Sequence, residues 1–141
     1  MVEVVKQDKW YDARECANNA DTLYVFGDNT QEVGCGGQAV IRYLPNSIGI
    51  PTKSKPTMEE DAFFDDSVVQ FLKVEQAICN ILKEMLSGKY SKVVFPGDGL
   101  GTGLAMMEEK SPILFDNMNI RIYECFGVDY GIPANIKKNL S

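Results

Sequence analysis

The sequence predicts a layered α/β fold with a mostly parallel sheet. Short apolar runs alternate along the chain with amphipathic segments of helical length, an order typical of strand–helix–strand units. Two of these runs, Thr22–Phe26 and Lys92–Phe95, each lead into a glycine-rich loop, and glycine clusters mark the end of a strand. The chain has 141 residues, which predicts one domain over 1–141 with a single sizeable core.

Three further runs are predicted as strands. Val2–Val5 is predicted to be a short edge strand. The proline in Ser47–Pro51 favours an edge or the end of a strand, because proline cannot donate a hydrogen bond to a neighbouring strand. Ile120–Cys125 alternates apolar and polar residues, the pattern of a half-buried strand.

The best-defined helix is predicted after Ser67. Its apolar residues recur at three- and four-residue spacing: Val68, Phe71, Leu72, Ile78, Ile81, Leu82, Met85 and Leu86. Ser67 and Gln70 form a capping-box pattern at the start, and Gly88 marks the end. Shorter helices are predicted at Tyr11–Asn18 (with Trp10 and Tyr11 packing at its start), Gly37–Tyr43, Leu104–Glu109, Ser111–Asn117 and in the tail after Gly127, and a loop at Thr52–Asp66.

The composition limits the classes of partner. Apolar residues make up 45% and charged residues 24%, as in ordinary globular proteins. The formal net charge is −6, from 14 Lys and Arg against 20 Asp and Glu, which disfavours non-specific binding to nucleic acid or anionic membranes. A bound phosphate must therefore be held mainly by backbone amides and one or two lysines or arginines, which favours a small-molecule partner. A nucleic acid is expected only as a modified substrate.

The cysteines and the absence of histidine argue against metal and Cys–His chemistry. The four cysteines form no C-x-x-C pair and the chain has no histidine, so we expect neither a zinc site nor a cofactor. Cys79 and Cys125 are predicted to be inert core thiols. A signal-peptide core and an apolar run of membrane-spanning length are both missing, which predicts a cytoplasmic protein.

The two glycine loops carry the functional prediction. Both follow an apolar strand and precede a helix, so in a parallel sheet both lie at the carboxyl ends of strands, where α/β folds bind ligands. Backbone N–H groups in such loops bind phosphate, and two facing loops suit a diphosphate. A purely structural turn is the alternative. Gly34–Ala39 also fits G-x-G-x-x-A, but the gap after Phe26 is too long for a dinucleotide-binding fold.

Three segments, in this order and spacing, resemble the macrodomain family, and the branch containing the terminal ADP-ribose glycohydrolases in particular. They are Gly34–Val40, Ile50–Thr57, and the stretch from Val94 through Leu100–Leu104 to Tyr123. The resemblance covers about residues 23–125, and the chain also resembles small uncharacterised proteins of phages and bacteria. It implies a three-layer α/β/α fold with a mixed, mostly parallel central sheet and a cleft for ADP-ribose.

The resemblance also implies roles for individual residues. The loop Gly34–Gly37 would approach the distal ribose, and Gly101–Gly103 would hold the diphosphate. Lys53 matches the nucleophilic lysine of the branch, which needs burial or a nearby cation such as Lys55 to lose its proton. The predicted ligand-binding residues are Asp28, Asn29, Gly34, Gly36, Gly37, Gln38, Thr52, Gly99, Gly101, Thr102, Gly103 and Leu104.

The catalytic aspartate of the branch has no direct counterpart, because Ala105 occupies its place. Asp98 is the first substitute and Asp28 the second, although Asp28 is equally suited to binding the adenine or to capping a turn. The alternatives for Lys53 are that it is an ordinary loop lysine or that it makes an electrostatic contact to a phosphate. Three functions follow: a hydrolase that removes ADP-ribose, a non-catalytic module that sequesters or reads an ADP-ribose-type nucleotide, or a protein-interaction domain that reuses the fold.

Overall fold

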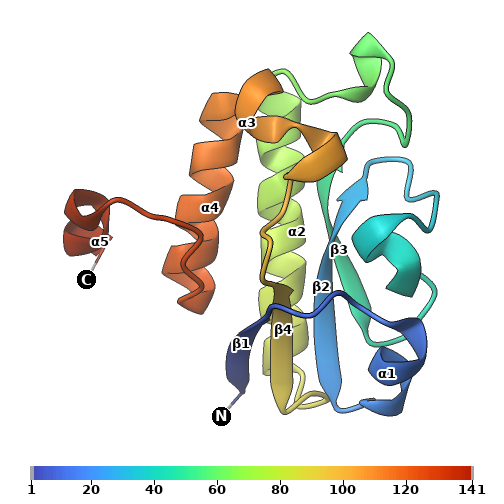
Figure 1. Cartoon of the computed structure of the whole chain (residues 1–141). Coiled ribbons are helices and arrows are strands. Elements are labelled where there is room, and N and C mark those ends of the chain that lie inside the picture. Colours follow the sequence, from blue (N-terminus) through green and yellow to red (C-terminus); the bar gives the residue numbers. More distant parts are fainter. Residues whose placement is uncertain (1, 141) are drawn as a thin grey trace.

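The computed structural model describes residues 2–140 and has a four-stranded sheet at its centre (Figure 1). The strands lie in the order β1-β4-β2-β3, and all three neighbouring pairs are parallel. Their bounds are β1 Glu3–Gln7, β2 Thr22–Asn29, β3 Ser47–Lys53 and β4 Lys92–Pro96. The two strands that lead into glycine loops, β2 and β4, are neighbours in the middle, and the predicted edge positions of the other two are confirmed.

Helices cover both faces of this sheet, so the predicted three-layer α/β architecture is confirmed (Figure 1). The α-helices are α1 Ala13–Asn18, α2 Val68–Leu86, α3 Met107–Lys110, α4 Pro112–Phe126 and α5 Ala134–Leu140. Short 3-10 helices occupy Gly37–Ile41, Glu60–Ala62 and Gly103–Ala105. Within residues 2–140, no helix is long and apolar enough to span a membrane.

The strand sequences divide between two cores because successive side chains point to opposite faces. In β2, Leu23 and Val25 pack in the larger core with α2 and α4, whereas Tyr24 and Phe26 pack on the other face with α1 and the 3-10 helix Gly37–Ile41. Both faces of β2 and β4 are therefore buried, which explains why these strands are continuous apolar runs.

The predicted strand Ile120–Cys125 is wrong, because these residues form the second half of α4. Leu114, Met118, Ile122 and Phe126 are all buried at four-residue spacing, so one helical stripe faces the core. The prediction ended the helix at Asn117, so Ile120–Cys125 was considered on its own. In so short a segment, the alternation of apolar and polar residues resembles a strand. Without this strand, all pairs in the sheet are parallel and the expected mixed sheet is also wrong.

The segments that enter the site differ from the prediction in two ways. Strand β2 continues through the predicted turn Gly27–Asn29, and β3 continues into the predicted loop to include Thr52 and Lys53. Each glycine loop is followed by a short 3-10 helix and not by a long α-helix. A short helix has only a weak dipole, so an anion at these loops would be bound by individual N–H groups.

Candidate functional site

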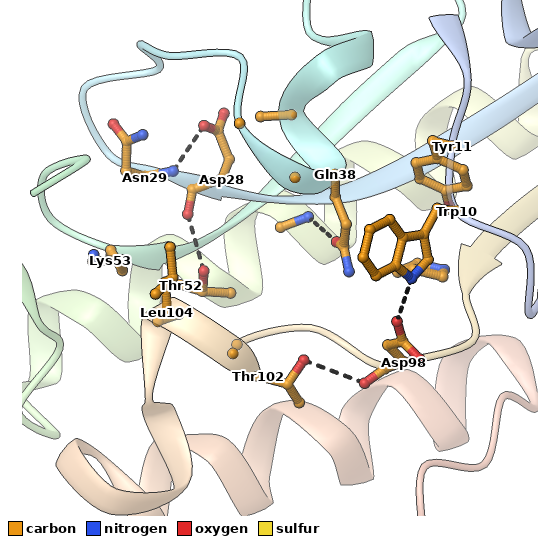
Figure 2. A pocket seen from close by; sticks show the side chains of 18 of the residues that line it. Trp10, Tyr11, Asp28, Asn29, Gln38, Thr52, Lys53, Asp98, Thr102 and Leu104 are labelled. Carbon is orange, nitrogen blue, oxygen red and sulfur yellow. Dashed lines mark hydrogen bonds between the residues drawn. The ribbon is translucent and has the colours of Figure 1, made fainter.

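The two glycine loops meet at one cleft of about 540 Å³, at the carboxyl ends of β2 and β4 (Figure 2). This volume lies in the range of small-molecule sites. The predicted site residues that line the cleft are Asp28, Asn29, Gly34, Gly36, Gly37, Gln38, Thr52, Lys53, Asp98, Gly101, Thr102, Gly103 and Leu104. Gly99 does not line it, because it faces Tyr130 in a neighbouring hollow.

Unpaired backbone N–H groups lie on both walls of the cleft. Within residues 2–140, no protein acceptor pairs with the N–H groups of Gly36, Gly101, Thr102 or Gly103. The second loop alternates in backbone conformation, with φ of +74° at Gly101, −87° at Thr102 and +60° at Gly103. Because glycine has no Cβ atom, the N–H groups of such a loop can approach an anion closely. The backbone therefore supplies hydrogen-bond donors for an anion in a protein whose net charge is negative.

Arg42 holds the first glycine loop in place. Its guanidinium group forms a two-point ion pair with Asp28, and both side chains are only 7% exposed. The same guanidinium donates to the carbonyl oxygen atoms of Gly34 at 2.8 Å and Val33 at 3.1 Å. Because the Asp28 carboxylate also accepts from the N–H of Asn29, its hydrogen-bonding capacity is largely used inside the protein. This arrangement favours a structural role for Asp28 over adenine binding or proton transfer.

Gln38 connects the first glycine loop and the end of β2 to the second glycine loop. Its side-chain carbonyl accepts from the Gly27 N–H at 2.8 Å, and its amide group donates to the Gly99 carbonyl at 2.9 Å. Both functional groups of this side chain are thus used to tie the end of β2 to the loop after β4. Gln38 lies at the cleft as predicted, but its contacts fix the distance between the walls.

Asn29 and Thr52 shape the floor of the cleft at the end of β2. The Asn29 side chain accepts from the Gln31 N–H and donates to the Val33 carbonyl, so it organises the turn into the first loop. The Thr52 hydroxyl donates to the Asp28 carbonyl at 3.0 Å. Both side chains are buried, so their role is to hold the backbone around the cleft.

Lys53 lies at the end of the cleft beside the segment 54–63 and is only 9% exposed. Its ammonium group donates to the Thr57 carbonyl and lies 4.9 Å from the centre of the Phe63 ring. Burial lowers the pKa of Lys53 below its ordinary value. Lys55 does not contribute to this lowering, because its own ammonium group pairs with Asp61.

Asp98 lies at the opposite end of the cleft from Lys53 (Figure 2). Its carboxylate accepts from the indole N–H of Trp10 at 3.2 Å, and its backbone carbonyl accepts from the Thr102 hydroxyl. Ala105, in the place of the family aspartate, also lines the cleft. The two predicted catalytic side chains are therefore separated, which argues against joint action at one carbon atom.

The sequence analysis missed two residues with clear roles at the cleft, Trp10 and Arg42. Trp10 was expected to pack at the start of α1, but it is 83% exposed and lines the cleft. The neighbouring Tyr11 does pack, with its hydroxyl 2.7 Å from the Val25 carbonyl. A tryptophan directly after the polar residues Asp8 and Lys9 is the only local sign of an exposed position. Nothing in the sequence around Arg42 predicts its role, because the folding of the loop determines which groups it contacts.

Residues 6–121 match the model of a protein family whose function is unknown, DUF7831. The chain belongs to this family. The match runs from the end of β1 to most of α4 and so includes both glycine loops and the whole lining of the cleft. Comparison with curated proteins and with solved structures gave no match.

Proposed function

We propose that this member of DUF7831 binds ADP-ribose or a related NAD-derived nucleotide in the cleft between its two glycine loops. The observation that carries the proposal is the pair of facing walls with unpaired N–H groups, at Gly36 on one side and Gly101–Gly103 on the other. A pyrophosphate carries oxygen atoms on both phosphorus atoms, so it can accept hydrogen bonds from both walls at once.

The charges around the cleft support recognition by the backbone. Arg42 is committed to Asp28, and Lys9 pairs with Glu15 at 2.6 Å. Lys53 is the remaining cation of the lining, and its ammonium group contacts the protein at Thr57. A small diphosphate fits this arrangement better than a polyanion, whose binding depends on many basic side chains.

Binding without catalysis is the form of the proposal that the geometry favours. Lys53 and Asp98 lie at opposite ends of the cleft, and the carboxylate of Asp28 is paired with Arg42 (Figure 2). We also propose a cytoplasmic location. The four free cysteines support it, because disulfides are rare in reducing compartments.

Thermal unfolding with ADP-ribose, NAD and ADP tests the binding proposal. A ligand at 100 times its Kd stabilises the native state by about 2.7 kcal/mol, which gives an easily measured rise in Tm. The matched variant is Gly36→Val. Gly36 has φ −82° and ψ 149°, and a Cβ atom there meets nothing within 4 Å, so the fold accepts a side chain. The variant should keep the ligand-free Tm and lose the ligand-induced rise. No rise for any nucleotide in the wild-type protein would refute the proposal.

A second candidate is hydrolysis of ADP-ribosyl linkages, favoured by the lowered pKa of Lys53. A lysine nucleophile must be neutral, so the rate would rise with pH through the pKa of Lys53. Lys53→Arg keeps the positive charge but cannot supply a neutral amine. Incubation with a mono-ADP-ribosylated protein should therefore show release of ADP-ribose by the wild type and none by Lys53→Arg. Equal rates in both would remove Lys53 as nucleophile, and no release by either would leave the binding module.

A further inference from the structure

We infer that Trp10 is the stacking platform for the nucleobase of the bound nucleotide, and that Asp98 holds its indole ring in position. This inference rests on the proposed function, since it assigns one end of the same cleft to one part of the ligand. Trp10 is 83% exposed, and it is the only tryptophan of the chain. Covering so much apolar surface is favourable, and a flat base can cover an indole ring by stacking on it.

The ring is held at the cleft by its own hydrogen bond and by the anchoring of the next residue. The indole N–H donates to the Asp98 carboxylate at 3.2 Å, and the next residue, Tyr11, is half-buried and donates its hydroxyl to the Val25 carbonyl of β2. The segment before Trp10 is held as well, because the Gly97 N–H donates to the Gln7 carbonyl at 2.8 Å. An aromatic ring positioned in advance loses little conformational entropy when a base stacks on it.

The position of Trp10 gives the ligand a direction. Figure 2 shows Trp10 and Asp98 at one end of the cleft, with Lys53 and Leu104 at the other. The glycine loops, which carry the unpaired N–H groups, also line this cleft. A base on Trp10 places the diphosphate along these loops and directs the rest of the nucleotide towards Lys53. Stacking accepts any base, so Trp10 does not select one base over another. The ligand class is therefore a nucleoside diphosphate with any base.

The fluorescence of Trp10 gives a specific test, because no other tryptophan contributes to the signal. The probes are ADP, which carries a base, and inorganic pyrophosphate, which does not. ADP should quench the emission as it saturates the site. Pyrophosphate should raise the Tm and compete with ADP, but it should leave the emission unchanged.

Substitutions separate stacking from phosphate binding. Trp10→Ala should weaken ADP binding about 10-fold or more, the usual effect of removing a base-stacking ring, and leave pyrophosphate affinity unchanged. Trp10→Phe retains a ring and should recover much of the loss. Asp98→Asn keeps an acceptor for the indole N–H and should bind ADP like the wild type, whereas Asp98→Ala should weaken ADP binding and not pyrophosphate binding.

The possible results are distinct. ADP binding with no quenching, or equal ADP affinity of wild type and Trp10→Ala, would overturn the stacking role while the proposed phosphate site stands. Equal loss of ADP and pyrophosphate binding in Trp10→Ala would also overturn it, because the residue would then shape the whole cleft. No binding of either probe to the wild type would refute the proposed function and this inference together.

Discussion

Replacement of Gly101 by alanine should destabilise the protein through two separate effects. A Cβ atom at this position would lie 2.1 Å from the sulfur atom and 2.7 Å from Cγ of Met107, which is fully buried. Overpacking of this kind costs roughly 1–3 kcal/mol. The φ of +74° adds roughly 1–2 kcal/mol, because side chains disfavour the left-handed region. The expected loss in the free energy of unfolding is therefore about 2–5 kcal/mol.

Gly103→Ala is the matched control in the same loop. Gly103 also has a positive φ, +60°, but a Cβ atom there meets nothing within 4 Å. This variant should lose only the conformational part, roughly 1–2 kcal/mol. Urea unfolding followed by circular dichroism measures both variants, with equal m values as the sign that only stability has changed.

The clash with Met107 can be tested on its own by a double-mutant cycle. Met107→Ala removes the side chain that the new Cβ atom meets, so it should cost less in Gly101→Ala than in the wild type, where it leaves a cavity. If Gly101→Ala loses no more stability than Gly103→Ala, or if the two substitutions at 101 and 107 are additive, the close approach of the loop to Met107 is refuted.

Three further predictions concern the contacts that hold the cleft. Gln38→Ala removes the bonds to Gly27 and Gly99 and should lower the free energy of unfolding by roughly 1–3 kcal/mol in urea unfolding, with a weaker ligand response; unchanged stability would contradict the bridging role. Arg42→Met leaves Asp28 buried and unpaired, so urea unfolding should show a loss of roughly 3–5 kcal/mol that Asp28→Asn in the same background partly recovers; no recovery would contradict the pairing. The bond from Lys137 lowers the pKa of Asp129 to about 2, so the native state binds fewer protons than the unfolded state. The stabilisation by Asp129 is present above its unfolded pKa of about 4 and is lost as the pH falls through about 2, and the difference in Tm between wild type and Asp129→Asn should shrink over this range.

Local sequence patterns predicted most of the secondary structure. The helix after Ser67 is present as α2, and the Gln70 side chain accepts from the Ser67 N–H at 3.3 Å as the capping pattern predicted. The strand runs before both glycine loops are β2 and β4. These predictions succeeded because hydrophobic periodicity and capping depend on residues a few positions apart. The strand prediction at Ile120–Cys125 failed because the buried stripe of α4 extends across Asn117, where the prediction ended the helix.

The sequence also predicted that the glycine loops share one cleft, and this is confirmed for Gly36 and Gly101. Two loops that follow parallel strands must lie at the same edge of the sheet, so the prediction needed only parallel strands. The structure added that β2 and β4 are neighbours. The roles of single polar residues were less predictable. Asp28 has the same sequence neighbours whether its carboxylate faces a ligand or Arg42, and only the folded loop brings the guanidinium to it.

The α/β class, the glycine loops that follow β2 and β4, and the small basic contribution to the site could all be read from the sequence, because they depend on local periodicity, glycine positions and net charge. Which donors and acceptors remain for a ligand depends on the folding of the whole chain. Gln38 reaches a partner 61 residues away and Arg42 one 14 residues away, and these contacts use up side chains that seemed available. The unpaired N–H groups and the exposed Trp10 remain, because hydrogen-bond satisfaction and burial are properties of the packed chain.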